Sequence, residues 1–303
     1  MLGKVAAMFP GQGSQSPGMA VSILQDFPKT HLVFEQAEDA TKILLKKLCS
    51  NLDKADELLK TQNQQPAILT TSYAVWSVLK EETGLCPEFF LGHSLGEYCA
   101  LVSAGLLGFE DAVKLVYRRG LAMQKAVPAG QGAMAAVLNY QEAQLVADCK
   151  EASLQLSKSV QVVNFNSPKQ QIISGDSEAV LFVCERLKEK KVITKILPVS
   201  APFHSSLMEP ARQEMAPLIE GTNFFESKSK VIANVTGKIE DPYKKKLLIE
   251  QIDHPVLWTR CLETAFSHGA TRFIEVGPGN VLIGLNRRIN KEVSSEKAKL
   301  ENN

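Results

Sequence analysis

Apolar residues occur along the chain in two patterns. Short apolar runs at 4–9 and 88–91 predict buried strands. Apolar positions spaced three and four residues apart predict helices over 28–48, 64–80 and 108–126. Strands that alternate with helices in this way favour a parallel α/β sheet.

The pattern changes near residue 130. From there the chain predicts strand, helix, strand, strand, helix and strand, over 133–138, 141–152, 160–165, 170–174, 178–190 and 195–199. This β-α-β-β-α-β order is typical of a ferredoxin-like domain. We therefore expect an α/β protein in which a small ferredoxin-like α+β domain, residues 130–200, is inserted into a large parallel-sheet domain, residues 1–129 and 201–303.

The last third of the chain returns to the large domain. Its pattern predicts a helix over 205–220, a strand over 230–235, two helices around Gln251 and Trp258, a strand and turn over 272–279, and a helix over 280–289. The final residues, 291–303, are polar and are expected to be frayed.

Composition and charge exclude several classes of protein. Hydrophobic residues make up 45% of the chain and charged residues 22%, which is typical of a globular protein rather than a disordered one. The net charge of +1 gives no electrostatic case for a nucleic-acid partner. No apolar run approaches the roughly 20 residues that span a bilayer, and no signal-peptide pattern is seen. A cytoplasmic protein with no membrane partner is expected.

Cysteine and histidine spacing gives no metal motif. The six cysteines are scattered without a C-x-x-C pair, so neither a structural zinc site nor a disulfide framework is expected. We expect them to be small buried apolar residues. The five histidines are not paired at metal-binding spacing, and no metal is expected.

A Gly-x-Ser-x-Gly motif, Gly92 to Gly96, follows the second predicted strand and precedes a helix-like run. This setting is that of a nucleophile elbow, in which Ser94 Oγ projects from a strained turn and the backbone amide of Leu95 points toward a developing oxyanion. The alternative is a serine that caps the helix, flanked by glycines that allow close packing.

A nucleophilic serine needs a base, and His204 is the best candidate. It lies at a strand-to-helix junction after Pro202, although a helix-capping histidine is the alternative. The acids considered as the third member of a triad, Asp176, Glu178 and Glu185, belong to the inserted domain, and none follows a strand of the large domain. The pattern therefore favours a Ser-His dyad whose imidazole is oriented by a backbone carbonyl.

Helical spacing distinguishes two adjacent arginines. Arg119 shares a face with apolar residues, whereas Arg118 shares one with charged residues, so Arg119 is expected to point inward. A buried guanidinium needs an anionic partner. That partner is either an internal Asp or Glu or the carboxylate of a substrate, which arginine can bind with two hydrogen bonds.

The loop "MFPGQGSQ" falls short of a dinucleotide-binding fingerprint. Gly11 and Gly13 fit, but Ser16 stands in place of the third glycine. A loop that brings Gln12 or its backbone close to the active site is the favoured interpretation.

Eight segments occur in an order that resembles the malonyl-CoA:acyl carrier protein transacylases, and the resemblance runs from about residue 4 to residue 289. They are "FPGQGSQ", "GHSLGEY", "RRGLAMQ", "GAMAAVL", "VNFNSPKQQIISG", "VSAPFHSSLM", "HPVLWT" and "EVGPGNVLIGL". The resemblance implies a large domain related to hydrolases and a small ferredoxin-like domain, in agreement with the pattern.

The resemblance also implies roles for individual residues. Ser94 is the implied nucleophile, His204 its base, and Arg119 the partner of the malonyl carboxylate. The backbone amides of Gln12 and Leu95 are implied to form the oxyanion hole.

Further residues carry implied roles in orientation and selectivity. The carbonyl oxygen of Gln251 is implied to orient His204. Phe203 resembles the residue of malonyl-selective relatives, since its ring fills the space of an α-methyl group. Asn164 and Asn166 correspond to asparagines near the cleft between the domains.

The implied reaction is ping-pong transfer of malonyl from malonyl-CoA to the phosphopantetheine thiol of holo acyl carrier protein, for fatty acid biosynthesis. No cofactor is expected, and a monomer is the expected state. Alternatives are an acyltransferase of a polyketide or polyunsaturated fatty acid synthase, a serine thioesterase or hydrolase, and a non-enzymatic binding subunit. Because carrier proteins are acidic, a basic docking surface is expected; three clusters are candidates, Lys188 with Lys190 and Lys191, Lys244–Lys246, and Arg287 with Arg288.

Overall fold

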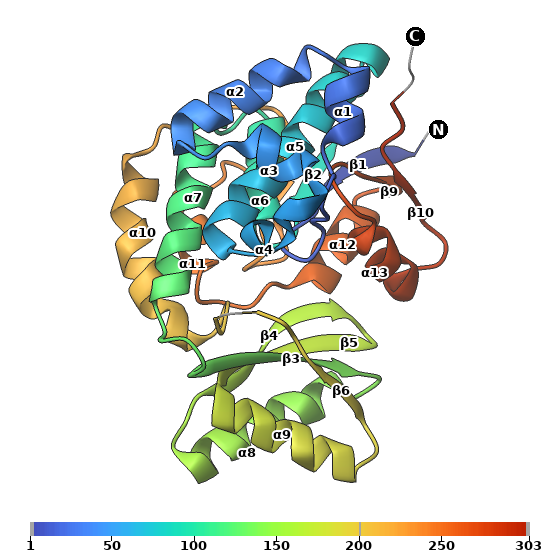
Figure 1. The fold of residues 1–303 in the computed structure, drawn as a ribbon. Helices are drawn as coiled ribbons and strands as arrows, with labels where there is room; N and C mark the ends of the chain where they lie inside the picture. The colour runs from blue at the N-terminus through green and yellow to red at the C-terminus, as the bar shows by residue number, and fades with distance from the viewer. Residues whose placement is uncertain (1–2, 200, 301–303) are drawn as a thin grey trace.

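The structure, a computed structural model, describes residues 3–199 and 201–300. Its larger sheet is a mostly parallel one (Figure 1). The strands lie in the order β10 (Ser294–Lys297), β9 (Ala270–Glu275), β1 (Lys4–Phe9), β2 (Phe89–Gly92), β7 (Lys230–Ile232) and β8 (Ile239–Glu240). Only the pairing of β8 with β7 is antiparallel within this sheet.

Helices cover both faces of the larger sheet, and the alternation of side chains along β1 explains why. Ala7 and Phe9 enter one apolar core, whereas Ala6 and Met8 enter the core on the opposite face. The first core is shared with α1 (Val21–Asp26), α2 (Thr30–Thr41), α3 (Leu45–Ser50), α4 (Ala55–Leu58), α5 (Thr61–Thr83), α6 (Gly96–Ser103), α7 (Phe109–Lys125), α10 (Glu209–Gly221) and α11 (Lys245–Glu250). The second core is shared with α12 (Trp258–Ser267) and α13 (Val281–Ile289).

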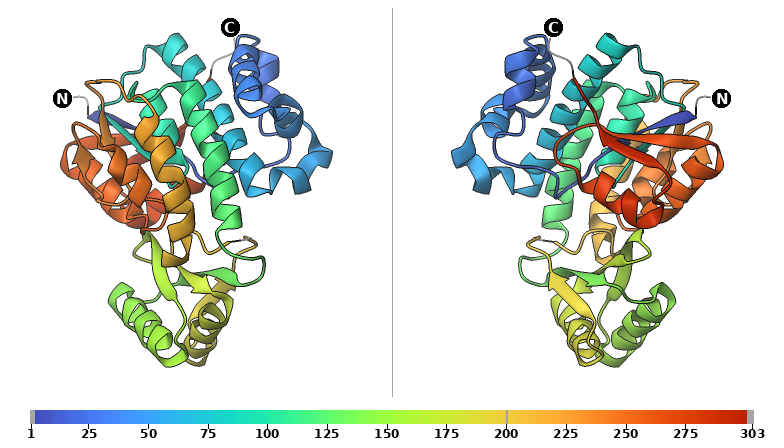
Figure 2. Two further views of the ribbon diagram at one scale, coloured as in Figure 1. Left: turned by 90° about the vertical axis from the view of Figure 1, so that its left-hand side faces the viewer. Right: turned by 90° about the vertical axis from the view of Figure 1, so that its right-hand side faces the viewer.

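A second, antiparallel sheet lies beside the first. Its strands are in the order β4 (Val160–Ser167), β5 (Gln170–Asp176), β3 (Gly132–Leu138) and β6 (Ile193–Ile196). In chain order this is 2-3-1-4, the ferredoxin-like arrangement. The helices α8 (Glu142–Leu156) and α9 (Ser177–Glu189) cover one face (Figures 1 and 2).

The other face of the small sheet turns toward the larger part of the molecule. Along β3, Ala135 and Val137 pack in the core with α8 and α9, whereas Met134 and Ala136 belong to the main core. The expected α/β architecture with a parallel core is confirmed. The division into domains at residues 130 and 200 stays a prediction, and residue 200 lies outside the described ranges.

Three expectations from the sequence were wrong in detail. The helix expected over 28–48 is two helices, because Lys42 adopts a left-handed backbone (φ 60°) that ends α2. The last strand of the small sheet, expected over 195–199, is β6 at Ile193–Ile196. The tail, expected to be frayed, contributes β10, which pairs in parallel with β9; residues 301–303 lie outside the described ranges.

The helices and the cysteines bear on two further expectations. In residues 3–199 and 201–300, no helix is both long and apolar enough to cross a membrane. All six cysteines are free, and five are buried as expected. Cys86 is the exception, because it is exposed.

Candidate active site

The turn that joins strand β2 to helix α6 has no room for a Cβ at Gly92 or at Gly96. A Cβ on Gly96 would lie 2.0 Å from the carbonyl oxygen of Phe9, and one on Gly92 would lie 1.9 Å from the carbonyl carbon of Gly96. Between these glycines, Ser94 has a left-handed backbone (φ 53°). The motif therefore builds a strained elbow with the serine at its apex.

The site lies where neighbouring parallel strands end, the usual place for ligands in an α/β sheet. Gln12 follows β1, Ser94 follows β2 and Asn234 follows β7, and these three strands are adjacent. The side chain of Asn234 fixes the elbow, since its Oδ1 accepts from the Ser94 amide (2.7 Å) and its Nδ2 donates to the Gly92 carbonyl (2.7 Å).

Ser94 and His204 form the pair expected from the sequence. Ser94 Oγ lies 2.7 Å from His204 Nε2, and His204 Nδ1 lies 2.8 Å from the Gln251 carbonyl oxygen. Because a carbonyl only accepts, Nδ1 carries the proton and Nε2 is left to accept from the serine. Among the described residues, no carboxylate bonds to the imidazole, so the arrangement is a dyad.

The electrostatic environment keeps His204 neutral. Burial, together with the nearby positive charge of Arg119, lowers the pKa of His204 to about 3. The residue itself is only 4% exposed. The imidazole is therefore unprotonated at neutral pH, and its Nε2 can accept the proton of Ser94.

Arg119 is fully buried next to the nucleophile. Its Nη2 donates to Ser94 Oγ (3.1 Å) and to Gln251 Oε1 (3.0 Å), and its Nη1 donates to Gln65 Oε1 (3.0 Å). Its Nε has no hydrogen-bond partner. All of these acceptors are neutral, and within the described part of the chain no Asp or Glu lies within 4.0 Å of the guanidinium. The internal ion pair that the sequence left open is therefore not formed there.

Arg118, in contrast, is exposed, as helical spacing predicts. The same helix, α7, thus points one arginine to solvent and the next into the core. Burial lowers the pKa of Arg119 from its ordinary value, while neighbouring Tyr98 and Glu97 oppose that shift. Arg119 therefore combines buried charge with unused hydrogen-bonding capacity.

The backbone amides of Gln12 and Leu95, implied to form an oxyanion hole, are both unpaired in the described part of the chain. Leu95 directly precedes the first residue of α6, so its amide belongs to a helix N-terminus, where unpaired N–H groups stabilise negative charge. The side chain of Gln12 donates from Nε2 to Gln64 Oε1 (2.5 Å).

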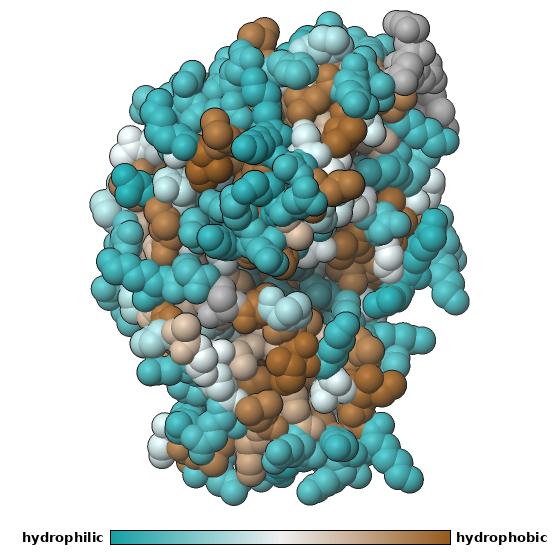
Figure 3. Space-filling view, in the orientation of Figure 1, coloured by the Kyte–Doolittle hydropathy of each residue, from teal (hydrophilic) through white to brown (hydrophobic). Residues whose placement is uncertain are grey.

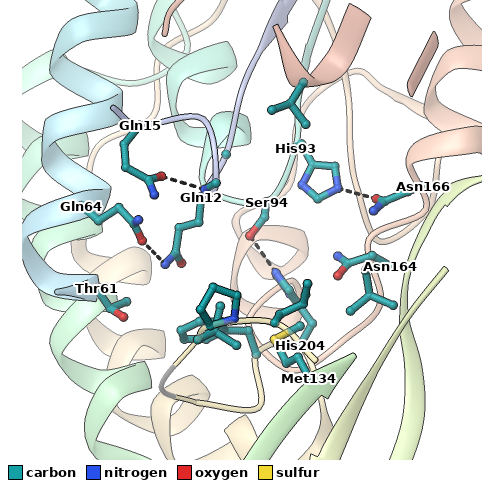
Figure 4. A pocket seen from close by; sticks show the side chains of 18 of the residues that line it. Gln12, Gln15, Thr61, Gln64, His93, Ser94, Met134, Asn164, Asn166 and His204 are labelled. Carbon is teal, nitrogen blue, oxygen red and sulfur yellow. Dashed lines mark hydrogen bonds between the residues drawn. The ribbon is translucent and has the colours of Figure 1, made fainter. Parts of the chain in front are cut away.

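A cavity of about 560 Å³ opens onto Ser94, His204 and Gln12 (Figure 4), whereas the fully buried Arg119 and Leu95 are not among its lining residues. Ser94, His204 and Phe203 line it, and so do Asn164 and Asn166 from β4. Apolar side chains of the small sheet and of α13 complete the wall: Met134, Ile172, Val281, Leu282 and Leu285. Apolar surface also gathers over the small sheet in the space-filling view (Figure 3). The volume of the cavity and its largely apolar lining allow it to accept a slender organic chain that ends at Ser94.

His93 turns away from the nucleophile although it precedes it in sequence. Its Nε2 lies 2.8 Å from Asn166 Oδ1 (Figure 4). Its ring packs against that of Trp258. Burial lowers the pKa of His93. These contacts join the elbow to Asn166 of the small sheet and to α12.

Four polar residues of the site were not anticipated from the sequence: Gln64, Gln65, Glu97 and Asn234. The two glutamines are buried in α5, and Glu97 lies in the first turn of α6, where an acidic residue is common at any helix N-terminus. For Gln64, Gln65 and Glu97, a polar residue among apolar positions of a helix was the only signal in the sequence. In the described ranges, no group of three His, Cys, Asp or Glu residues could hold a metal ion.

Comparisons with known proteins agree with this geometry. A family model described as acyl transferase domain matches residues 8–299. The chain is 40% identical over 297 residues to the malonyl CoA-acyl carrier protein transacylase of Bacillus subtilis (strain 168), covering 97% of this chain and 93% of that protein. The crystal structure of an acyl-carrier-protein S-malonyltransferase from Burkholderia pseudomallei 1710b is similar with a TM-score of 0.93 and 40% identity, covering 97% and 96% of the two chains.

A third similarity concerns a complex. A malonyl-transacylase solved together with its type II PKS acyl-carrier protein has a TM-score of 0.93 and 38% identity, with 97% of this chain and 95% of that chain covered.

Proposed function

The chain belongs to the malonyl-CoA:acyl carrier protein transacylase family, and from this premise we propose that it transfers malonyl groups to an acyl carrier protein through a malonyl ester of Ser94. The enzyme is an acyltransferase. The observation that carries the proposal is the fully buried Arg119, 3.1 Å from the nucleophilic oxygen and with no carboxylate of the described residues within 4.0 Å.

The first half-reaction acylates the serine. His204 Nε2 takes the proton of Ser94 as Oγ attacks the thioester carbonyl of malonyl-CoA. The amides of Gln12 and Leu95 stabilise the oxyanion, a contribution of about 3 kcal/mol per donor in serine enzymes. The C–S bond then breaks, and the coenzyme A thiolate takes the proton from His204.

The second half-reaction reverses these roles with a new thiol. The phosphopantetheine thiol of holo acyl carrier protein gives its proton to His204 and attacks the malonyl ester. The serine leaves and recovers its proton from the imidazole. The carbonyl of Gln251 stabilises the imidazolium that forms in each half-reaction, since it accepts from Nδ1. No cofactor takes part in this scheme.

Selectivity comes from charge and shape beside Ser94. Arg119 binds the free carboxylate of the malonyl group, which an acetyl group lacks. Phe203, which is 6% exposed and lines the cavity, is the residue that we propose to exclude an α-methyl substituent. Asn164 and Asn166 extend the polar lining toward the small sheet.

The carrier protein is proposed to dock next to the cavity on α13. This helix carries the exposed Arg287 and Arg288, and Val281, Leu282 and Leu285 at its beginning and middle line the cavity. The cluster that contains Lys190 is partly neutralised, because Lys190 pairs with Asp148 (3.0 Å). Basic residues on α13 fit an acidic carrier that must deliver its prosthetic arm to this opening. We further propose a monomeric enzyme of the cytoplasm.

Two alternative activities share this chemistry. A carrier of polyketide synthesis is one, because a structural relative was solved with a type II PKS acyl-carrier protein. A serine hydrolase that releases malonate to water is the other. One experiment separates them: malonyl-CoA is supplied with holo carrier proteins of fatty acid and polyketide synthesis, and malonyl-carrier and free malonate are measured by mass spectrometry.

Transfer to a fatty-acid carrier supports the proposal, and exclusive transfer to the polyketide carrier favours the first alternative. Malonate release without carrier modification would overturn the transacylase assignment. A Ser94→Ala variant is the control for uncatalysed exchange.

A further inference from the structure

A buried carboxylate, that of Glu97, is separated from Arg119 by a single side chain. It is 1% exposed and accepts hydrogen bonds from Tyr243 Oη (2.6 Å), Gln251 Nε2 (2.6 Å) and the Asn234 amide (3.2 Å). Burial raises the pKa of Glu97 to about 7, against the lowering effect of the bonds from Tyr243 and Gln251. The mechanism above gives this group no role.

The side chain of Gln251 stands between Glu97 and Arg119. Its Nε2 donates to Glu97 Oε2 (2.6 Å), and its Oε1 accepts from Arg119 Nη2 (3.0 Å). Gln251 Nε2 also donates to the Ser94 carbonyl (2.9 Å). A reversed amide would face oxygen to oxygen on one side and donor to donor on the other, so these neighbours fix one orientation.

This arrangement keeps the negative charge near Arg119 without neutralising it directly. A buried carboxylate in contact with a guanidinium forms a strong pair, and a second carboxylate must then compete for the same donors. An amide contact satisfies one donor and leaves the positive charge uncompensated at short range. The carboxylate behind the amide still favours the charged form of the arginine.

We propose that the Gln251 side chain separates Glu97 from Arg119, and that this separation keeps the guanidinium available to the carboxylate of the acyl group. The Gln251 side chain is then a positioning residue for substrate selection, and Glu97 is the acid that it keeps out of contact with the guanidinium. This inference rests on the proposed function and adds to it the reason why an arginine with a nearby acid still selects an anionic substrate.

The test exchanges the two side chains. In the double variant Glu97→Gln/Gln251→Glu the carboxylate contacts Arg119 directly, whereas the backbone carbonyl that orients His204 remains. The matched control is Glu97→Gln, which has the same residue at position 97 and keeps the amide against Arg119. Acylation of Ser94 by malonyl-CoA and by acetyl-CoA is followed by intact-protein mass spectrometry, with thermal unfolding measured on each variant.

The proposal predicts that the exchange lowers the ratio of malonyl to acetyl acylation rates at least about tenfold relative to Glu97→Gln, because the malonyl carboxylate then competes with an internal one. It also predicts that Glu97→Gln keeps the wild-type ratio. Equal ratios in the exchange and the control would overturn the proposal. This includes the case in which both rates fall by the same factor, which indicates a purely structural role.

If the double variant does not fold, Gln251→Glu alone carries the same prediction, since its carboxylate also meets Arg119. Failure of the proposed function is separate and visible in the wild type, as the absence of any malonyl adduct on Ser94.

Discussion

The guanidinium of Arg119 donates a hydrogen bond to Ser94 Oγ across 3.1 Å, so a fully buried positive charge lies beside the nucleophile. The contact joins the middle of α7 to the turn after β2. A serine that must carry an anionic acyl group needs such a neighbour, whereas a general hydrolase does not.

Replacing Arg119 by alanine is expected to slow acylation by malonyl-CoA by about 100-fold or more, because the malonyl carboxylate loses its charged partner in a buried site. Acylation by acetyl-CoA should change far less. Both rates are measured by rapid quench and intact-protein mass spectrometry. Arg118→Ala is the matched control, since that side chain is exposed on the same helix. A variant at position 119 that still strongly preferred malonyl would contradict the role of the arginine.

The pH dependence of acylation should reveal the environment of His204. Its pKa is lowered to about 3 from an ordinary 6.5, so the imidazole stays neutral and able to accept a proton from pH 8 down to pH 5. We expect no inflection near pH 6.5 in kcat/KM for malonyl-pantetheine, a thioester without phosphate groups. Glu97→Gln serves as a control, because burial places the pKa of Glu97 at about 7. A decline centred near pH 6.5 in both proteins would show an ordinary histidine.

The steric role of the glycines in the elbow can be tested by measuring the stability of alanine variants. Gly96→Ala would place a Cβ 2.0 Å from the Phe9 carbonyl oxygen, and the backbone would have to shift. We expect a loss of at least about 2 kcal/mol in the free energy of unfolding. Gly284→Ala in α13 has no heavy atom within 4 Å of the new Cβ and should be neutral or stabilising by up to about 1 kcal/mol. Equal effects in urea denaturation would disprove the steric explanation.

Phe203 is expected to exclude branched acyl groups. Phe203→Ser should increase acylation by methylmalonyl-CoA relative to malonyl-CoA by about tenfold, since one methyl group in a pocket is worth about 1–3 kcal/mol. Competition between the two thioesters gives the ratio directly. Phe225→Ser, at a side chain that is 55% exposed, should leave the ratio unchanged. An unchanged ratio in Phe203→Ser would show that other residues of the cavity determine the selectivity.

Local patterns in the sequence anticipated much of the site. The glycines around Ser94 indicated a tight turn, and the three- and four-residue spacing in α7 indicated that Arg119 points inward. Both signals arise from residues close together along the chain, where backbone geometry decides the outcome.

Contacts between distant residues could not be anticipated in the same way. Glu97 and Gln251 are 154 positions apart, and Arg119 and Gln65 are 54 apart, yet each pair is hydrogen-bonded. The polar strand β10 was also missed, because backbone pairing with β9 requires no apolar alternation at the edge of a sheet.

The most direct test of a malonyl-serine intermediate is the mass of the intact protein after brief incubation with malonyl-CoA. We expect one malonyl adduct, located on Ser94, which is absent in Ser94→Ala and is discharged when holo acyl carrier protein is added. A wild-type protein without an adduct, or an adduct that persists in Ser94→Ala, would contradict it.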